Sequence, residues 1–187
     1  MDQRMVRTLS ACSILVALSI VLTRFASFRI PYFGVENIRI GFGPFPIILG
    51  GIIFGPFFGA IIGILADVIG FMISPIGTYL PYFTLVSSLN GFIPGLMMIN
   101  FPKNTLSSSF SLRFVTGVIV SQLLNQWLLL PWLLFVSFQV PVKISLFPRL
   151  ISAPVQIIAY IILGFSILSR PIIKKYFFSL SPNSNHL

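Results

Sequence analysis

Charged residues divide this chain into long apolar runs. Uncharged stretches cover residues 8–23, 114–142 and 150–169, and the 63 residues of 40–102 contain a single charge, Asp67. A membrane-spanning helix needs about 20 consecutive apolar residues. The three shorter runs each accommodate one such helix and the longest accommodates three, so the pattern predicts six membrane-spanning helices.

Stretches rich in Gly, Pro and polar residues separate these helices. Residues 27–44, SFRIPYFGVENIRIGFGP, form a long connection full of turn formers, which favours a functional external loop between the first two helices. We expect 1–170 to form one all-α integral membrane domain and 171–187 a polar cytoplasmic tail. The expected helices cover about 6–26, 46–55 with some preceding residues, about 57–73, about 82–100, the segment from the inner loop 101–113 to about 138 with an interruption at Pro131, and about 149–168.

The basic residues favour one orientation. Lys and Arg are enriched in the cytoplasmic loops of membrane proteins. With the N-terminus inside, seven basic residues are cytoplasmic and five are external, which predicts an N-in/C-in topology. The first apolar run lacks a small-residue cleavage site, so we expect it to be a retained helix.

The composition excludes most soluble functions. Only 8% of the 187 residues are charged, whereas soluble domains have about 25%. The net charge of +9 would suggest nucleic acid in a soluble protein, but 20 Phe residues and the lack of a basic run on a soluble face argue against that partner. The lipid bilayer is the expected surrounding.

The chain also lacks the residues that most membrane enzymes need. It has one His, His186, one Cys, Cys12, no HExxH motif and no close pair of carboxylates, so we expect neither a metal site nor a protease. The GxxxxGK[ST] motif is missing as well. We therefore expect no enzyme and no cofactor in this chain, and any ATP-driven step requires a partner.

Glycines recur every fourth residue at Gly51, Gly55, Gly59 and Gly63. Small residues at this spacing let helices approach closely in a membrane. Asp67 continues the same series and is therefore expected to face protein rather than lipid.

Polar side chains within apolar helices usually mark a site because lipid solvates them poorly. Arginine can bind a carboxylate through two hydrogen bonds, amides and an aspartate match the edges of a heterocycle, and aromatic rings can stack on it. The pattern favours a pocket for an anionic ring compound. The candidate substrate-binding residues are Arg24, Arg39, Asp67, Asn90, Gln126, Trp127, Arg149 and Gln156.

Each candidate also has a structural interpretation. Arg24 and Arg149, near helix ends, could extend to the membrane interface. Asn90 and Gln126 could hydrogen-bond between helices, and Asp67 could pair with an arginine inside the protein. Sequence leaves these alternatives open.

Several segments resemble the substrate-binding (S) components of energy-coupling-factor vitamin transporters. FGPFFGAIIGILADVIG and LVALSIVLTR are similar to this superfamily in general. IRIGFGPFPI and RLISAPVQII look more like its folate-specific, FolT-type members. The similarity covers about residues 6–170.

This resemblance implies a six-helix protein of the bacterial cell membrane that captures a vitamin from outside. It implies as partners the coupling subunit EcfT and the ATPases EcfA and EcfA′, which use the ATP. S components contact EcfT through an Ala-xxx-Ala motif on the first helix. The matching positions here are Ser13 and Ala17, with Ala11 nearby, and the serine departs from the motif.

The expected ligand is folate, with its glutamate tail near the mouth of the pocket and its pterin ring deeper. An S component for another vitamin or precursor, such as hydroxymethylpyrimidine or thiamine, is the nearest alternative. Five external basic residues fit a cationic ligand poorly. Two further alternatives are a proton-coupled transporter that uses Asp67 as its relay and a structural membrane subunit that binds no small ligand.

Overall fold

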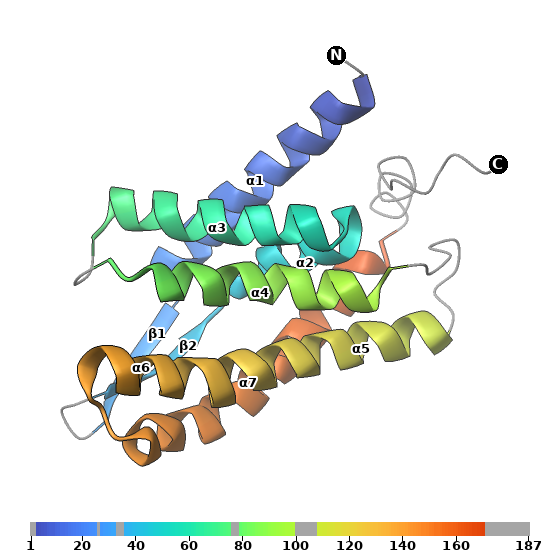
Figure 1. Ribbon diagram of the computed structural model, residues 1–187. Coiled ribbons are helices and arrows are strands. Elements are labelled where there is room, and N and C mark those ends of the chain that lie inside the picture. The colour runs from blue at the N-terminus through green and yellow to red at the C-terminus, as the bar shows by residue number, and fades with distance from the viewer. Residues whose placement is uncertain (1–2, 26, 33–35, 76–78, 100–107, 171–187) are drawn as a thin grey trace.

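The computed structural model describes the chain except for residues 1–2, 26, 33–35, 76–78, 100–107 and 171–187. Six helical rods run roughly along one direction, and the fifth is continuous through a π-helical turn (Figure 1). The six-helix prediction is confirmed, while the predicted tail, 171–187, lies outside the described residues. The elements are α1 (Gln3–Phe25), β1 (Ser27–Tyr32), β2 (Glu36–Gly41), α2 (Pro44–Phe54), α3 (Pro56–Ile73), α4 (Pro81–Met97), α5 (Ser108–Leu123), the π-helix η1 (Leu124–Leu129), α6 (Leu130–Phe138) and α7 (Val142–Leu168).

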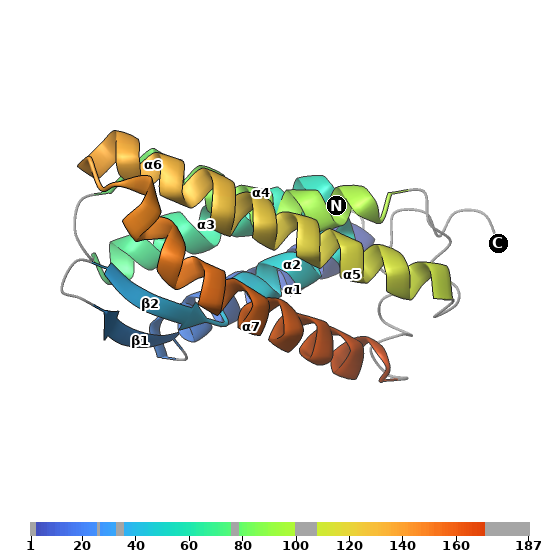
Figure 2. The ribbon, with the colours of Figure 1, turned by 90° about the horizontal axis from the view of Figure 1, so that it is seen from below.

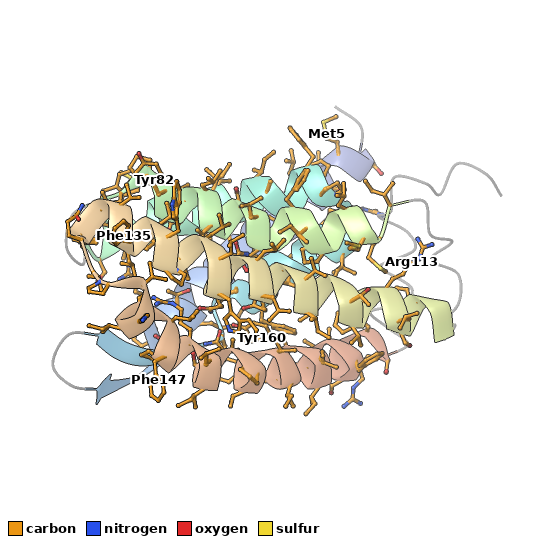
Figure 3. All side chains as sticks on the ribbon, turned by 60° about the horizontal axis from the view of Figure 1, so that its bottom comes forward. Met5, Tyr82, Arg113, Phe135, Phe147 and Tyr160 are labelled. Atoms are coloured by element: carbon orange, nitrogen blue, oxygen red, sulfur yellow. The ribbon has the colours of Figure 1, made fainter. Side chains whose placement is uncertain are left out.

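The outer surface of the bundle is apolar. Within the described residues, four helical segments are long and apolar enough to cross a membrane: Met5–Phe25, Pro56–Ile73, Phe110–Phe138 and Val142–Leu168. Large side chains such as Phe135 and Phe147 are exposed on the outside, whereas Tyr160 lies between the helices (Figure 3). An exposed apolar surface of this extent suits lipid as the solvent. The first turn of α1 and the last turn of α7 lie at the same end of the bundle, as an N-in/C-in topology requires (Figure 1).

Much of the predicted external loop is a β-hairpin. β1 and β2 pair antiparallel, with Ser27 opposite Gly41 and Tyr32 opposite Glu36. The hairpin lies beside the N-terminal half of α7 (Figure 2). The Tyr160 hydroxyl of α7 donates to the Gly41 carbonyl at 2.5 Å. This bond attaches the end of the hairpin to the bundle.

Glycines bring the backbones of α2, α3 and α4 into direct contact. A Cβ atom at Gly59 would lie 2.5 Å from Gly51 Cα and 2.7 Å from the Gly91 carbonyl oxygen, closer than real contacts allow. The predicted role of the glycine series in packing is therefore confirmed for Gly51 and Gly59. Gly55 has a different role: its φ of 96° forms the turn between α2 and α3, which any side chain would strain.

Three features of the later helices differ from the sequence prediction: α5 begins at Ser108, within the inner loop predicted for 101–113, and the other two involve prolines. α7 begins at Val142 rather than at about residue 149 and continues through Pro148 and Pro154. The sequence interpretation treated Pro148 as the end of a loop, but in a membrane bundle neighbouring groups can compensate for a missing backbone N–H. The interruption expected at Pro131 lies just before it, as the π-helical turn of η1. Proline clashes with the carbonyl four residues earlier, so the preceding turn widens.

Candidate functional site

A cavity of about 530 Å³ lies between the outer halves of the helices. It falls within the range of about 300–1,000 Å³ that is typical of small-molecule sites. Its walls come from α1, the β2–α2 junction, α3, α4, η1, α6 and α7. The cavity brings together most of the predicted site residues, namely Arg24, Asp67, Asn90, Gln126, Arg149 and Gln156.

Two arginines from opposite ends of the chain line the outer part of this cavity. Arg24, in the last turn of α1, donates from Nη2 to the Gly70 carbonyl at 2.5 Å. Its Nε is buried without a hydrogen-bond partner among the described residues. Arg149 of α7 donates from Nη1 to the carbonyl and the hydroxyl of Ser145. Backbone and hydroxyl oxygens thus hold both guanidinium groups at the cavity.

Asp67 of α3 has a hydroxyl rather than an arginine as its hydrogen-bond partner in the described structure. The Thr84 hydroxyl donates to Asp67 Oδ2 at 2.7 Å, and Tyr79 Oη lies 2.7 Å from Thr84 Oγ1. Asp67 lines the cavity, as its place in the glycine series predicted. A carboxylate has about four lone-pair sites, so Asp67 can also accept hydrogen bonds from a ligand.

Amide side chains form a layer deeper in the bundle. Asn90 Oδ1 accepts from Gln122 Nε2 at 3.2 Å and from Asn125 Nδ2 at 2.9 Å. Gln126 Nε2 donates to Gln156 Oε1 at 3.3 Å. The interhelical hydrogen bonds considered as an alternative for Asn90 and Gln126 therefore exist. Both residues also line the cavity, so the two interpretations are compatible.

The cavity consequently has two chemical layers. Charged groups from α1, α3 and α7 surround its outer part, and neutral amides from α4, η1 and α7 form its floor. We call this second set, Asn90, Asn125, Gln126 and Gln156, the amide floor. Such an arrangement suits a ligand with an anionic end and a neutral polar ring.

Two predicted residues are not found in the cavity wall. The side chain of Trp127 is 39% exposed and lies outside the cavity lining. Trp127 lies two positions after Asn125 in the π-helical turn, so the two side chains point to nearly opposite sides of the helix. Arg39 pairs with Arg29 in the hairpin, and its side chain lies outside the described part of the structure.

Sequence reasoning missed Thr84 and Gln122. The Thr84 hydroxyl donates to Asp67, and Gln122, which is 1% exposed, donates from its amide to Asn90 Oδ1. A signal for Gln122 was present, because residues 122, 125 and 126 follow the i, i+3, i+4 spacing of one helix face. Thr84 carries no comparable signal in an apolar helix.

The predicted docking residues of α1 do not all lie on one face. Ser13 and Ala17 are exposed, whereas Ala11 is half-buried and packs against a cluster that includes Cys12, Val16 and Ile62. Ser13 Oγ donates to the Leu9 carbonyl at 3.0 Å, so its hydroxyl is satisfied within the helix. The exposed small-residue face therefore consists of Ser13 and Ala17, without Ala11.

A family model described as "ECF-type riboflavin transporter, S component" matches residues 3–176. The chain belongs to this family. It is therefore a multi-pass membrane protein and an S component of a vitamin transporter.

Known relatives of this S component include folate proteins. It is 42% identical over 86 residues to "Folate transporter FolT" of Clostridium novyi (strain NT), a match that covers 46% of this chain and 47% of that protein. The chain thus matches about half the length of this curated relative. The solved structure "Crystal structure of FolT bound with folic acid" superposes with a TM-score of 0.66 at 27% identity, covering 83% of this chain and 91% of that one. "Structure and mechanism of the S component of a bacterial ECF transporter" superposes with a TM-score of 0.63 at 23% identity, covering 87% and 96%, and shows the fold alone.

Proposed function

We propose that this S component captures folate from outside the cell and delivers it across the bacterial plasma membrane together with an ATP-hydrolysing module. The observation that carries the proposal is the cavity with two arginines above a floor of neutral amides. Folate has two carboxylates at one end and a neutral pterin ring at the other. The similarity to folate-binding relatives supports the same ligand.

In this proposal the glutamate tail of folate lies near Arg24 and Arg149. Arg24 Nε has no partner in the described structure and offers a donor to a carboxylate. Hydrogen bonds to charged groups contribute about 1.5–3 kcal/mol each. In the proposal Asp67 accepts from N–H groups of the ligand and does not face its carboxylates, since two carboxylates would repel each other.

Riboflavin, the vitamin in the family description, suits this cavity less well. Its ribityl chain carries hydroxyl groups and no carboxylate, so riboflavin offers no anionic group to the two guanidinium groups. A carboxylate forms charge-assisted, bidentate hydrogen bonds with a guanidinium group, and a neutral hydroxyl does not. The arginines therefore favour folate over riboflavin.

The proposed partner surface is the exposed face of α1 at Ser13 and Ala17. Small residues allow a neighbouring transmembrane helix to approach closely. The proposal assigns this face to the coupling subunit EcfT, and assigns ATP hydrolysis to EcfA and EcfA′. This chain then needs no nucleotide site of its own.

Calorimetric titration of the purified protein with folic acid, riboflavin and thiamine tests the ligand. We expect folic acid to bind, and to bind far more tightly than the other two. Tight binding of riboflavin with no response to folic acid would refute the proposed function while leaving the family unchanged.

A further inference from the structure

The amide floor contains one acceptor without a donor. Asn125 is 1% exposed and lines the cavity, and its Oδ1 has no hydrogen-bond partner among the described residues. Buried polar atoms are nearly always paired in folded proteins, and an unpaired one is costly. This oxygen therefore indicates a missing partner, which a bound ligand could supply.

The hydrogen bonds around Asn125 fix which end of its amide is free. Asn90 Nδ2 donates to the Val86 carbonyl at 3.2 Å, so Asn90 Oδ1 must be the acceptor end. Both Gln122 Nε2 and Asn125 Nδ2 then donate to this oxygen. The nitrogen end of the Asn125 amide therefore faces Asn90, and its oxygen end is the acceptor without a partner.

The position of Asn125 also favours contact with a ligand. It lies in the π-helical turn η1, whose backbone widens around it: the Leu130 N–H bonds to the Asn125 carbonyl five residues earlier. Such turns occur frequently at functional sites. Asn125 lines the cavity, and the terminal torsion of an asparagine is broad, so its amide can adjust to a ligand.

From this geometry we infer that Asn125 Oδ1 selects the ring of the ligand by accepting a hydrogen bond from an N–H donor. Asn90 is a positioning residue that holds the amide in this orientation. The inference rests on the proposed function, because in folate the donors are the 2-amino group and N3–H of the pterin. A ring with only acceptors on that edge would leave Asn125 unpaired and is rejected.

The test measures the binding of three ligands to the wild type, to Asn125→Leu and to the control Ser121→Ala, by calorimetric titration of the purified, full-length protein. The ligands are folic acid, an analogue with a methyl group in place of the 2-amino group, and an N3-methylated analogue. Asn125→Leu removes the acceptor at similar volume. Ser121→Ala is the matched control, because Ser121 lies one turn earlier on α5, is also buried with an unpartnered oxygen among the described residues, and does not line the cavity.

We expect Asn125→Leu to bind folic acid about ten- to a hundred-fold more weakly than the wild type, because the ligand donor is left unpaired. Ser121→Ala should bind like the wild type. One of the two analogues lacks the donor that pairs with Asn125. For that analogue, the dissociation constants of the wild type and Asn125→Leu should agree within about threefold, because neither protein then forms this hydrogen bond. Asn125→Ser, a second variant with a shorter side chain, should show the same pattern if Asn125→Leu does not fold.

Two results would overturn the inference in different ways. If the wild type binds folic acid but Asn125→Leu weakens all three ligands equally, or none of them, Asn125 does not recognise a donor and only the inference fails. If the wild type does not bind folic acid at all, the proposed function fails and this inference with it.

Discussion

The contact among α2, α3 and α4 leads to a sharp prediction for Gly59→Ala. The added methyl group would meet backbone atoms on two sides, at 2.5 Å from Gly51 Cα and 2.7 Å from the Gly91 oxygen, whereas ordinary contact begins near 3.4 Å. No side-chain rotation can relieve a clash with backbone, so the helices must separate. Forcing extra volume into a packed core costs about 1–3 kcal/mol.

Gly70→Ala on the same helix is the matched control. Its Cβ atom would lie 3.8 Å from Ile20 and 3.9 Å from Arg24 Nη2, which is ordinary contact. Both substitutions gain helix propensity, by about 1 kcal/mol in water. Their difference therefore reports the backbone contact at Gly59 rather than the general effect of replacing glycine.

Thermal unfolding in detergent can be followed at the single cysteine. Cys12 is 8% exposed and packs in a cluster with Ile62 and Ala66 of α3, so a thiol-reactive dye labels it when the bundle opens. One kcal/mol shifts the melting temperature by about 2–4 °C in soluble chains of 150–250 residues. We expect Gly59→Ala to melt several degrees below the wild type and Gly70→Ala to melt at or above it. Equal melting temperatures for Gly59→Ala and the wild type would refute the proposed close packing.

Three further predictions test the site and its coupling. Arg149→Ala should weaken folic acid binding by roughly ten- to a hundred-fold, since it removes a charged donor. The control Arg113→Ala, near the first turn of α5 and outside the cavity lining, should bind folic acid like the wild type. Unchanged titration curves for both variants would show that Arg149 only anchors the protein at the membrane interface. Ala17→Trp should bind folic acid normally yet abolish uptake in cells that express the whole transporter, because a large ring blocks close helix packing. Ile162→Trp, exposed on α7, should transport normally, and full uptake by Ala17→Trp would exclude the α1 docking face. In proteoliposomes containing this chain alone, a pH gradient should drive no folate accumulation; accumulation that disappears in Asp67→Asn would instead establish a proton relay.

The helices could be predicted well from the sequence because a membrane-spanning helix is recognised by the length of its uncharged apolar run. A run of about 20 apolar residues without charge has few alternatives in a membrane, so all six helices were found at nearly the correct places. The hairpin was missed because its signal is weaker. Residues 27–32 and 36–41 are short, and Gly and Pro nearby suggested an irregular loop.

Most of the site residues predicted from the sequence line the cavity, but the orientation of their side chains and the hydrogen bonds among them could not be predicted. Asp67 followed from the glycine period, and the buried amides from their cost in lipid. Trp127 was included as a ring that could stack on the ligand, but its side chain lies outside the cavity lining. The orientation of Asn125 depends on Asn90, 35 positions away on another helix, and no local pattern contains that information.

The distribution of polar groups with depth explains why such a protein requires a partner with an energy source. Among the described residues, an apolar cluster that includes Ile52, Phe114 and Val118 packs the inner part of the bundle, and none of these three lines the cavity. Carrying an anion through this core would be costly, and the backbone contacts around Gly59 oppose separation of the helices. Under the proposed function, movement of the whole bundle would release the ligand without carrying it through this core. The exposed small-residue face of α1 is the surface that the proposed function assigns to the coupling subunit for this movement.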